Sequence, residues 1–230
     1  MLYLFDIDGT LLLSGGAGSR ALDRVFADLY GVAGAMDHVR PGGKTDPMII
    51  EEIFATRLGR APEAGEIDRV LELYLPLLRE ELATSERFRL MPAVEGTLDF
   101  LAGSTGVVLG LATGNIRPAA QAKLERGGLW QRFALGGFGC DHRDRHRLVA
   151  RAIERAADRA GAAVHPREVI VVGDTPMDVA AARACGALAV AVATGTASRD
   201  ELAACAPDAL LGTLVELPDW HDRRCAAAPA

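Results

Sequence analysis

Short apolar runs recur along the chain, and each is followed by small or acidic residues. The runs are continuously hydrophobic rather than alternating with polar residues, which is typical of parallel β-strands covered on both faces. They lie at residues 1–5 (MLYLF), 107–112 (VVLGLA), 169–172 (VIVV) and 187–192 (ALAVAV). The pattern predicts four strands of one parallel sheet.

Between the later runs lie stretches whose apolar residues recur at helical spacing. These stretches are Ala119–Arg126, Arg147–Ala160 and Met177–Ala184. Because strands and helices alternate in this way, we expect an α/β fold with a Rossmann-like, doubly wound parallel sheet.

The segment from Ser14 to Leu90 interrupts this alternation, because its periodicity is helical and it contains no convincing strand. Asp46 followed by Pro47 predicts a helix N-cap with proline at the first helical position. An insertion of this kind after the first strand would form an all-α cap over the strand ends. The three predicted helices are Ser19–Tyr30, Asp46–Leu58 and Ala64–Thr84.

With 230 residues, the chain is long enough for one substantial core and a smaller module. We expect a core formed by residues 1–13 and 91–217 and a helical cap formed by residues 14–90. Residues 218–230 are polar and then rich in alanine and proline, which predicts a loosely ordered tail.

Composition excludes several classes of partner. The net charge of −6 argues against binding to nucleic acid, and no apolar run approaches the roughly 20 residues of a membrane span. The four cysteines form no C-x-x-C pair, so neither a zinc site nor redox chemistry is indicated. Free thiols predict a cytoplasmic protein, and the chain could be a monomer or a homodimer.

Two carboxylates directly follow the first apolar run, in the stretch DIDGT at residues 6–10. Ligands of open α/β sheets bind at the carboxyl ends of the strands. A pair of carboxylates there is costly unless a cation or a shared proton relieves the repulsion. Asp6 and Asp8 are therefore candidate functional residues.

A second pair of acids, Asp174 and Asp178, occurs in GDTPMD at residues 173–178, where another run ends. If that strand neighbours the first, Asp6, Asp8 and Asp174 converge. Oxygen donors of this kind suit Mg²⁺, which is usually held by a few carboxylates together with waters and phosphate oxygens.

A third strand end carries Thr113-Gly114-Asn115 just before a predicted helix. Its hydroxyl and backbone N–H groups form a natural cradle for an anion. Acids, an anion cradle and Mg²⁺ together predict phosphoryl transfer, in which one carboxylate can attack phosphorus.

This ordered set of motifs, DxDGT, a strand ending in Thr-Gly-Asn, and GDxxxD, resembles the haloacid dehalogenase-like hydrolase superfamily. The closest resemblance is to its phosphoglycolate-phosphatase-like branch with a helical cap, and it extends from Met1 to about Leu217. It implies a Mg²⁺-dependent phosphatase acting on a small phosphomonoester, either phosphoglycolate-like or a sugar phosphate.

The resemblance also implies roles for individual residues. Asp6 would be the nucleophile that becomes phosphorylated, and Asp8 the general acid and then the base for water. The metal would be held by the Asp6 carboxylate, the Asp8 carbonyl and Asp174, with Asp178 bound through water or in support. Thr113 and Gly114 would hold the phosphoryl group, and Asn115 would contribute to substrate binding.

The family also needs a cation on the phosphoryl oxygens, usually a lysine that precedes a proline. The expected region, residues 141–147, contains no lysine. Spacing favours Arg145, with Arg143 and Lys123 as alternatives, although arginine is not a neutral replacement for lysine. Lys44 lies in a predicted cap loop, where it could meet the substrate's leaving group.

The same residues suggest other kinds of site or protein. An EF-hand calcium loop starting at Asp6 would need glycine and glutamate where the chain has Leu11 and Ala17. The glycines at residues 16–18 lie too far beyond the strand for a dinucleotide site and instead predict a hinge. A sugar-phosphate mutase shares the same acids and stays open. A non-catalytic binding or regulatory protein would be expected to lack Asp6 or Asp8.

Overall fold

The computed structural model describes residues 1–227, and its core is a six-stranded parallel sheet with the strand order β5-β4-β1-β6-β7-β8. This order confirms the predicted Rossmann-like α/β core. Two short strands, β5 and β8, extend the sheet beyond the four predicted strands. The strands are β1 (Leu2–Phe5), β4 (Val108–Ala112), β5 (Leu135–Gly137), β6 (Val169–Gly173), β7 (Leu188–Val192) and β8 (Ala209–Leu211).

The central strand β1 lies between β4 and β6, which meets the condition for the acidic motifs to converge. Phe5 at its carboxyl end is in register with Leu111 of β4 and Val172 of β6. The residues that follow these three strands therefore emerge side by side at one edge of the sheet.

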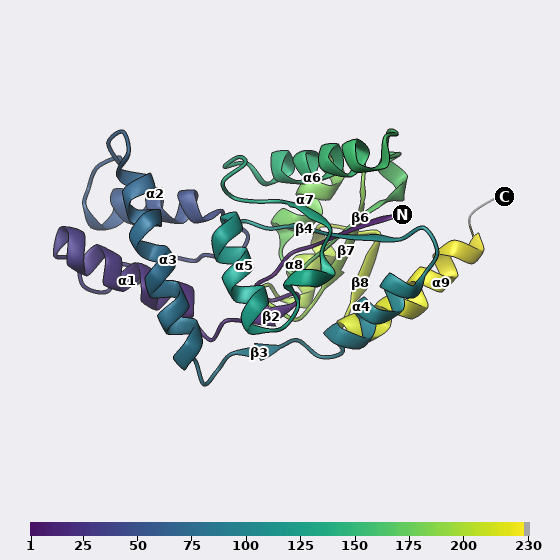
Figure 1. The fold of residues 1–230 in the computed structure, drawn as a ribbon, viewed down its shortest axis with the longest axis horizontal. Helices are drawn as coiled ribbons and strands as arrows, with labels where there is room; N and C mark the ends of the chain where they lie inside the picture. The colour runs from purple at the N-terminus through teal and green to yellow at the C-terminus, as the bar shows by residue number, and fades with distance from the viewer. Residues whose placement is uncertain (228–230) are drawn as a thin grey trace.

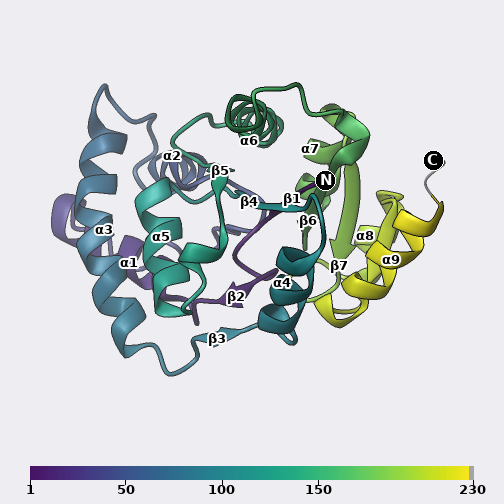
Figure 2. The same cartoon turned by 45° about the vertical axis from the view of Figure 1, so that its right-hand side comes forward.

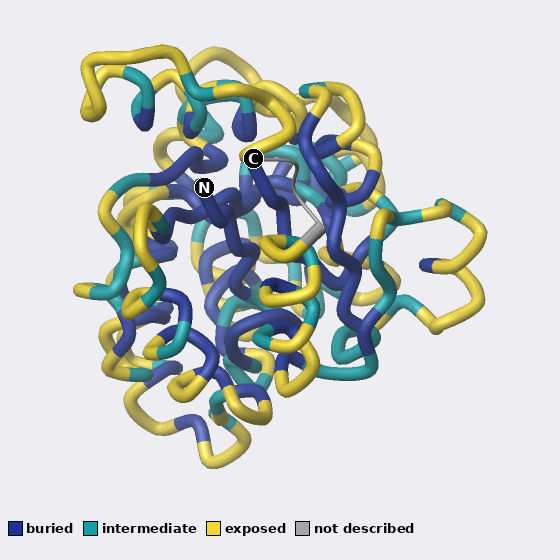
Figure 3. The backbone as a smooth tube through the Cα atoms, turned by 90° about the vertical axis from the view of Figure 1, so that its right-hand side faces the viewer, coloured by how far each residue is buried: buried dark blue, intermediate teal, exposed yellow. Residues whose placement is uncertain are grey.

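Helices cover both faces of the sheet (Figures 1 and 2). Tyr3 and Phe5 face the apolar layer under α4 (Val94–Gly103), α5 (Arg117–Arg126) and α9 (Leu217–Ala227). Leu2 and Leu4 face the layer under α6 (Arg145–Ala160), α7 (Pro176–Ala184) and α8 (Arg199–Ala204). Successive side chains of a strand point to opposite faces, so β1 is buried on both (Figure 3).

The predicted helical insertion forms α1 (Ala17–Tyr30), α2 (Asp46–Arg57) and α3 (Glu66–Thr84). These helices share an apolar cluster of their own, in which the Phe26 and Phe54 rings meet edge to face. Ile116 and Ala119 join this cluster from the start of α5, so the cap rests on the core through that helix. We refer to α1–α3 and their connecting loops as the cap.

The N-cap of α2 differs from the prediction. It is Thr45, whose hydroxyl accepts a hydrogen bond from the Met48 N–H at 3.4 Å. Asp46 is already the first helical residue, and its side chain accepts a hydrogen bond from outside the helix, from the Ile116 N–H.

A two-stranded antiparallel ribbon joins the cap to the core where no strand was predicted. It pairs β2 (Leu12–Leu13) with β3 (Arg89–Leu90). Strands of this length carry too few residues to show a periodicity. The remaining short elements are the 3₁₀ turns Trp130–Arg132, Pro166–Glu168 and Leu214–Glu216.

The prediction of a loosely ordered tail is wrong for residues 218–227, which belong to helix α9; its last part, 228–230, lies outside the described residues. Leu217 and His221 are buried, and Trp220 packs against the same apolar layer. The Tyr3 hydroxyl bonds to His221 Nδ1 at 2.8 Å. These residues are spaced at i, i+3 and i+4, a helical pattern that the polar and Ala/Pro-rich composition obscured.

Within the described part of the chain, no helix combines the length and the apolar character needed to cross a membrane.

Candidate active site

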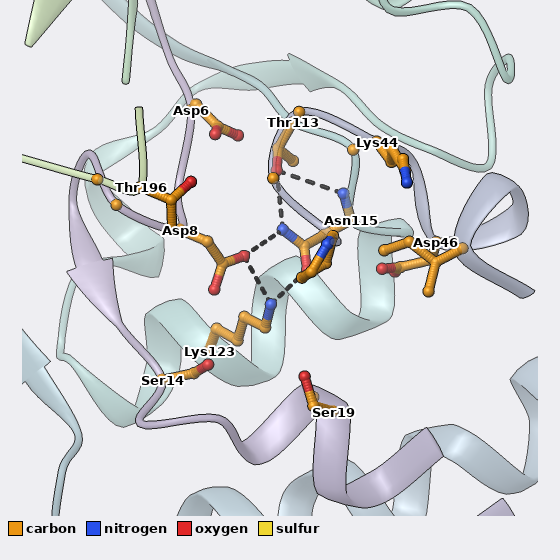
Figure 4. Close-up of a pocket in the computed structure, with 18 of the residues that line it drawn as sticks. Asp6, Asp8, Ser14, Ser19, Lys44, Asp46, Thr113, Asn115, Lys123 and Thr196 are labelled. Carbon is orange, nitrogen blue, oxygen red and sulfur yellow. Dashed lines mark hydrogen bonds and ion pairs between the residues drawn. The ribbon is translucent and has the colours of Figure 1, made fainter. Parts of the chain in front are cut away.

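A cavity of about 300 Å³ lies at the carboxyl ends of β1, β4 and β6, beneath the cap (Figure 4). Most of the residues predicted for the site line it. They are Asp6, Asp8, Lys44, Thr113, Gly114, Asn115, Lys123, Arg145 and Asp174. Of the other candidates, Asp178 lies behind this surface, and Arg143 lies apart from it, paired with Glu51 at 2.7 Å.

Asp6, Asp174 and Asp178 form a buried cluster of three carboxylates. One oxygen from each lies within 4.8 Å of the other two. Burial, reinforced by the neighbouring carboxylates, raises the pKa of Asp6 to about 6 and that of Asp174 to about 8. A divalent cation would relieve this repulsion, and the hard oxygen donors fit Mg²⁺. The Asp8 carboxylate is not part of the group, so the Asp8 carbonyl stays a predicted ligand.

Small residues and hydroxyls hold Asp174 in place. Thr10 donates a hydrogen bond to Asp174 Oδ1 at 3.0 Å. A Cβ at Gly9 would lie 2.5 Å from Asp174 Oδ2, and one at Gly195 would collide with the same carboxylate. Thr194 donates to the Gly9 carbonyl at 2.6 Å. Sequence reasoning assigned these positions no role, although Thr194-Gly195 follows a strand just as Thr113-Gly114 does.

Arg145 is the cation beside the predicted nucleophile. It is buried, and its Nη2 lies 2.9 Å from Asp6 Oδ1. Its Nε donates to Asp178 Oδ1 at 2.8 Å, and its Nη1 donates to the Gly43 carbonyl of the cap at 3.2 Å. Burial alone would lower the pKa of the guanidinium, but the Asp178 and Asp6 carboxylates outweigh it and raise that pKa. Arg145 therefore stays charged at the base of the cavity.

Lys123 lies opposite Asp8 rather than Asp6. Its Nζ donates to Asp8 Oδ2 and to Asn115 Oδ1, both at 2.6 Å. Asn115 Nδ2 in turn donates to Asp8 Oδ2 and to Thr113 Oγ1, both at 2.9 Å (Figure 4). All the bonds to the Asp8 carboxylate found in the described chain use Oδ2, so Oδ1 is available to a bound molecule.

The cap touches the core directly at the rim of the cavity. Asp46 N–H donates to the Gly114 carbonyl at 2.8 Å, and Ile116 N–H donates to Asp46 Oδ2 at 2.7 Å. Lys44, two residues earlier, forms an ion pair with Glu52 of α2. Burial raises the pKa of Asp46 to about 6, although Lys123 and the Ile116 N–H act in the opposite direction. Sequence reasoning treated Asp46 only as a helix start.

A family model of haloacid dehalogenase-like hydrolases matches residues 1–186. The chain is 28% identical over 220 residues to the probable phosphatase IndB of Dickeya dadantii (strain 3937), covering 94% of this chain and 91% of that protein. It is 29% identical over 227 residues to a phosphoglycolate phosphatase of Rhodospirillum rubrum, covering 94% and 89%. The crystal structure of CbbY from Rhodobacter sphaeroides in complex with phosphate has the same fold, with a TM-score of 0.74 at 20% identity over 94% of this chain and 95% of that one.

The family model covers most of the chain, including both acidic motifs at residues 6–10 and 173–178. The resemblance inferred from those motifs is thereby confirmed: the chain belongs to the haloacid dehalogenase-like hydrolase family.

Proposed function

We propose that the chain is a Mg²⁺-dependent phosphatase that hydrolyses a small phosphomonoester through a phospho-aspartyl intermediate on Asp6. The observation that carries the proposal is the separation of the two motif acids. Asp6 is buried beside Arg145 and the other two carboxylates, whereas Asp8 is held by Lys123 and Asn115. Two carboxylates in different environments can serve as nucleophile and as proton carrier.

In the first step, a carboxylate oxygen of Asp6 attacks phosphorus, and the bond from phosphorus to the ester oxygen breaks. Asp8 gives its proton to the departing alkoxide from Oδ1, the oxygen that no donor among residues 1–227 contacts. Arg145 neutralises charge on the phosphoryl oxygens, while the Thr113 hydroxyl and the Gly114 N–H supply donors. The products of the step are an alcohol and phospho-Asp6.

In the second step, Asp8 takes a proton from a water molecule as that water attacks the phosphorus of phospho-Asp6. The acyl-phosphate bond breaks, inorganic phosphate leaves, and the Asp6 carboxylate is restored. Lys123 holds the Asp8 carboxylate in position for this step, because its Nζ lies 2.6 Å from Oδ2.

Asp6, Asp174, the Asp8 carbonyl and Asp178, directly or through water, would hold Mg²⁺. When bound, the ion neutralises phosphoryl charge and relieves the repulsion among the buried carboxylates. The four free cysteines also support a reducing compartment such as the cytoplasm.

The test is release of inorganic phosphate from a broad panel of phosphate esters, with Mg²⁺ and with chelator. We expect Mg²⁺-dependent release from at least one small ester. Release from none of them would refute the proposal, and conversion of a sugar phosphate into its positional isomer would identify a mutase instead.

A further inference from the structure

The side chains that line the cavity determine which leaving group fits beside the phosphoryl group. Resting on the proposed phosphatase function, we propose that the leaving group is an uncharged, hydroxyl-bearing alcohol of the polyol or sugar type. A leaving group with a carboxylate, such as glycolate, does not fit the charges that line the cavity.

The cations of the cavity are all matched by carboxylates of the protein. In the described residues, its lining contains Lys44, Lys123 and Arg145 as the basic side chains. Lys44 pairs with Glu52, and Lys123 pairs with Asp8. Arg145 pairs with two acids and is needed at the phosphoryl group. A second anionic group on the substrate would therefore meet no uncommitted cation.

The cap side of the cavity also presents an acid of its own. Asp46 is 8% exposed and lines the cavity, with its carboxylate directed toward it in Figure 4. Oδ2 accepts the Ile116 N–H, and no protein donor reaches Oδ1 within residues 1–227. Oδ1 can accept a hydrogen bond from a substrate hydroxyl, whereas a substrate carboxylate there would be repelled.

Two hydroxyls from different cap helices face the same space. Ser19 of α1 and Tyr74 of α3 line the cavity, and neither has a hydrogen-bond partner in the described part of the chain. Tyr74 is 2% exposed, and a Cβ at Gly18 would lie 3.2 Å from its oxygen, so the glycine keeps the hydroxyl uncovered. Both hydroxyls are open to the cavity, so a hydroxylated leaving group would supply them with hydrogen-bond partners.

Apolar side chains complete this part of the wall, at Leu22, Met36 and Ile49. A surface that combines hydroxyls, one carboxylate acceptor and apolar patches is complementary to a polyol or sugar, which presents both hydroxyls and C–H groups. It offers no unpaired cation to an acid, because the basic side chains of the lining already pair with carboxylates.

Two matched pairs of esters test the inference. In each pair, 2-hydroxyethyl phosphate with 2-phosphoglycolate and glycerol 3-phosphate with 3-phosphoglycerate, a terminal CH₂OH replaces a carboxylate. We expect kcat/KM at least about tenfold higher for the uncharged member. Calorimetric titration of the Asp6→Asn protein, loaded with Mg²⁺, should give the same order of affinity without relying on turnover.

Two variants test whether the cap side of the cavity causes the preference for uncharged esters. Asp46→Asn keeps an acceptor for the Ile116 N–H. It should raise affinity and kcat/KM for 3-phosphoglycerate several-fold relative to those for glycerol 3-phosphate. Tyr74→Phe should lower the ratio of glycerol 3-phosphate to ethyl phosphate several-fold, because ethyl phosphate has no hydroxyl to contact. If these residues had a purely structural role, each variant would lower kcat/KM and affinity equally for both esters of its pair.

The outcomes separate the two proposals. Loss of turnover for every ester, with the uncharged member still bound more tightly, would reject the phosphatase function and support the inference. The inference would be overturned if kcat/KM or affinity for the carboxylate esters equalled or exceeded that for the uncharged esters, or if neither class bound. It would also be overturned if neither variant changed the ratios.

Discussion

Gly114 is the point at which the cap loop packs on the core with no side chain between them. A Cβ at this position would overlap the Lys44 carbonyl oxygen and lie 2.9 Å from its carbonyl carbon and 3.0 Å from the Thr45 Cα. All three are backbone atoms, so no rotamer change can relieve the overlap. Gly114→Ala therefore requires the cap loop to move away by roughly 1 Å, since close packing leaves no void to absorb the methyl group.

The movement breaks two of the contacts that hold the cap on the core. They are the hydrogen bonds from Asp46 N–H to Gly114 O at 2.8 Å and from Ile116 N–H to Asp46 Oδ2 at 2.7 Å. At about 1 kcal/mol for the first and up to about 3 kcal/mol for the charged acceptor, the closed arrangement should weaken by roughly 2–4 kcal/mol. That free energy corresponds to roughly a 30- to 900-fold smaller ratio of the closed to the open form.

The assay is kcat/KM for the best ester of the panel, measured beside the thermal unfolding midpoint. We expect Gly114→Ala to lose at least about 30-fold in kcat/KM, because the closed cap completes the wall around the leaving group. The matched control is Gly96→Ala in α4, where a Cβ would meet nothing within 4 Å. Activity of Gly114→Ala within threefold of the control would refute the reasoning that cap contact at this glycine serves the reaction.

Four further predictions follow from the same geometry. Asp6→Asn should lower phosphate release by at least about 10³-fold with an unchanged circular dichroism spectrum, and near-wild-type activity would reject the nucleophile. Arg145→Ala should lower kcat more than Lys123→Ala, because only Arg145 contacts Asp6; the reverse order in steady-state kinetics would reassign the cation. The pKa of Asp46 is raised in the folded protein from 3.8 to about 6, so its contribution to the free energy of unfolding falls as pH rises from about 4 to about 6. Asp46→Asn should therefore stabilise the protein at pH 7 by up to about 3 kcal/mol and give no gain below pH 4, and a loss of stability at pH 7 in urea unfolding would contradict this. Mg²⁺ should raise the unfolding temperature of the wild type, and Asp174→Asn should abolish most of that shift; an equal shift in both proteins would place the ion elsewhere.

The acids of the site could be predicted because their signals are local. Asp6 and Asp174 each follow directly after a continuous apolar run, and residues that follow parallel strands meet at one edge of the sheet. Only the adjacency of β1 and β6 in the sheet had to be assumed. The cap helices were equally accessible, because each carries its own periodicity.

The identity of the cation beside Asp6 could not be predicted from local sequence signals. Spacing along the chain left Arg145, Arg143 and Lys123 as candidates. In the fold, Arg145 begins α6 and points under the sheet edge, Arg143 pairs with Glu51 on the cap, and Lys123 reaches Asp8 from α5. Which basic side chain faces which carboxylate depends on how helices pack, and nearest neighbours in the sequence do not encode it.

The sequence by itself determined the parallel α/β core, the inserted helices and the acidic motifs, because each follows from the periodicity or order of residues close together in the chain. The tertiary structure decided the closure of the cap. Asp46 bonds to Ile116, 70 positions away, and Gly114 packs under Lys44. It also decided that the basic side chains lining the cavity are already paired, and the proposed choice of leaving group rests on this pairing. Charge balance depends on distances in space, and those distances exist only once the cap has folded onto the sheet.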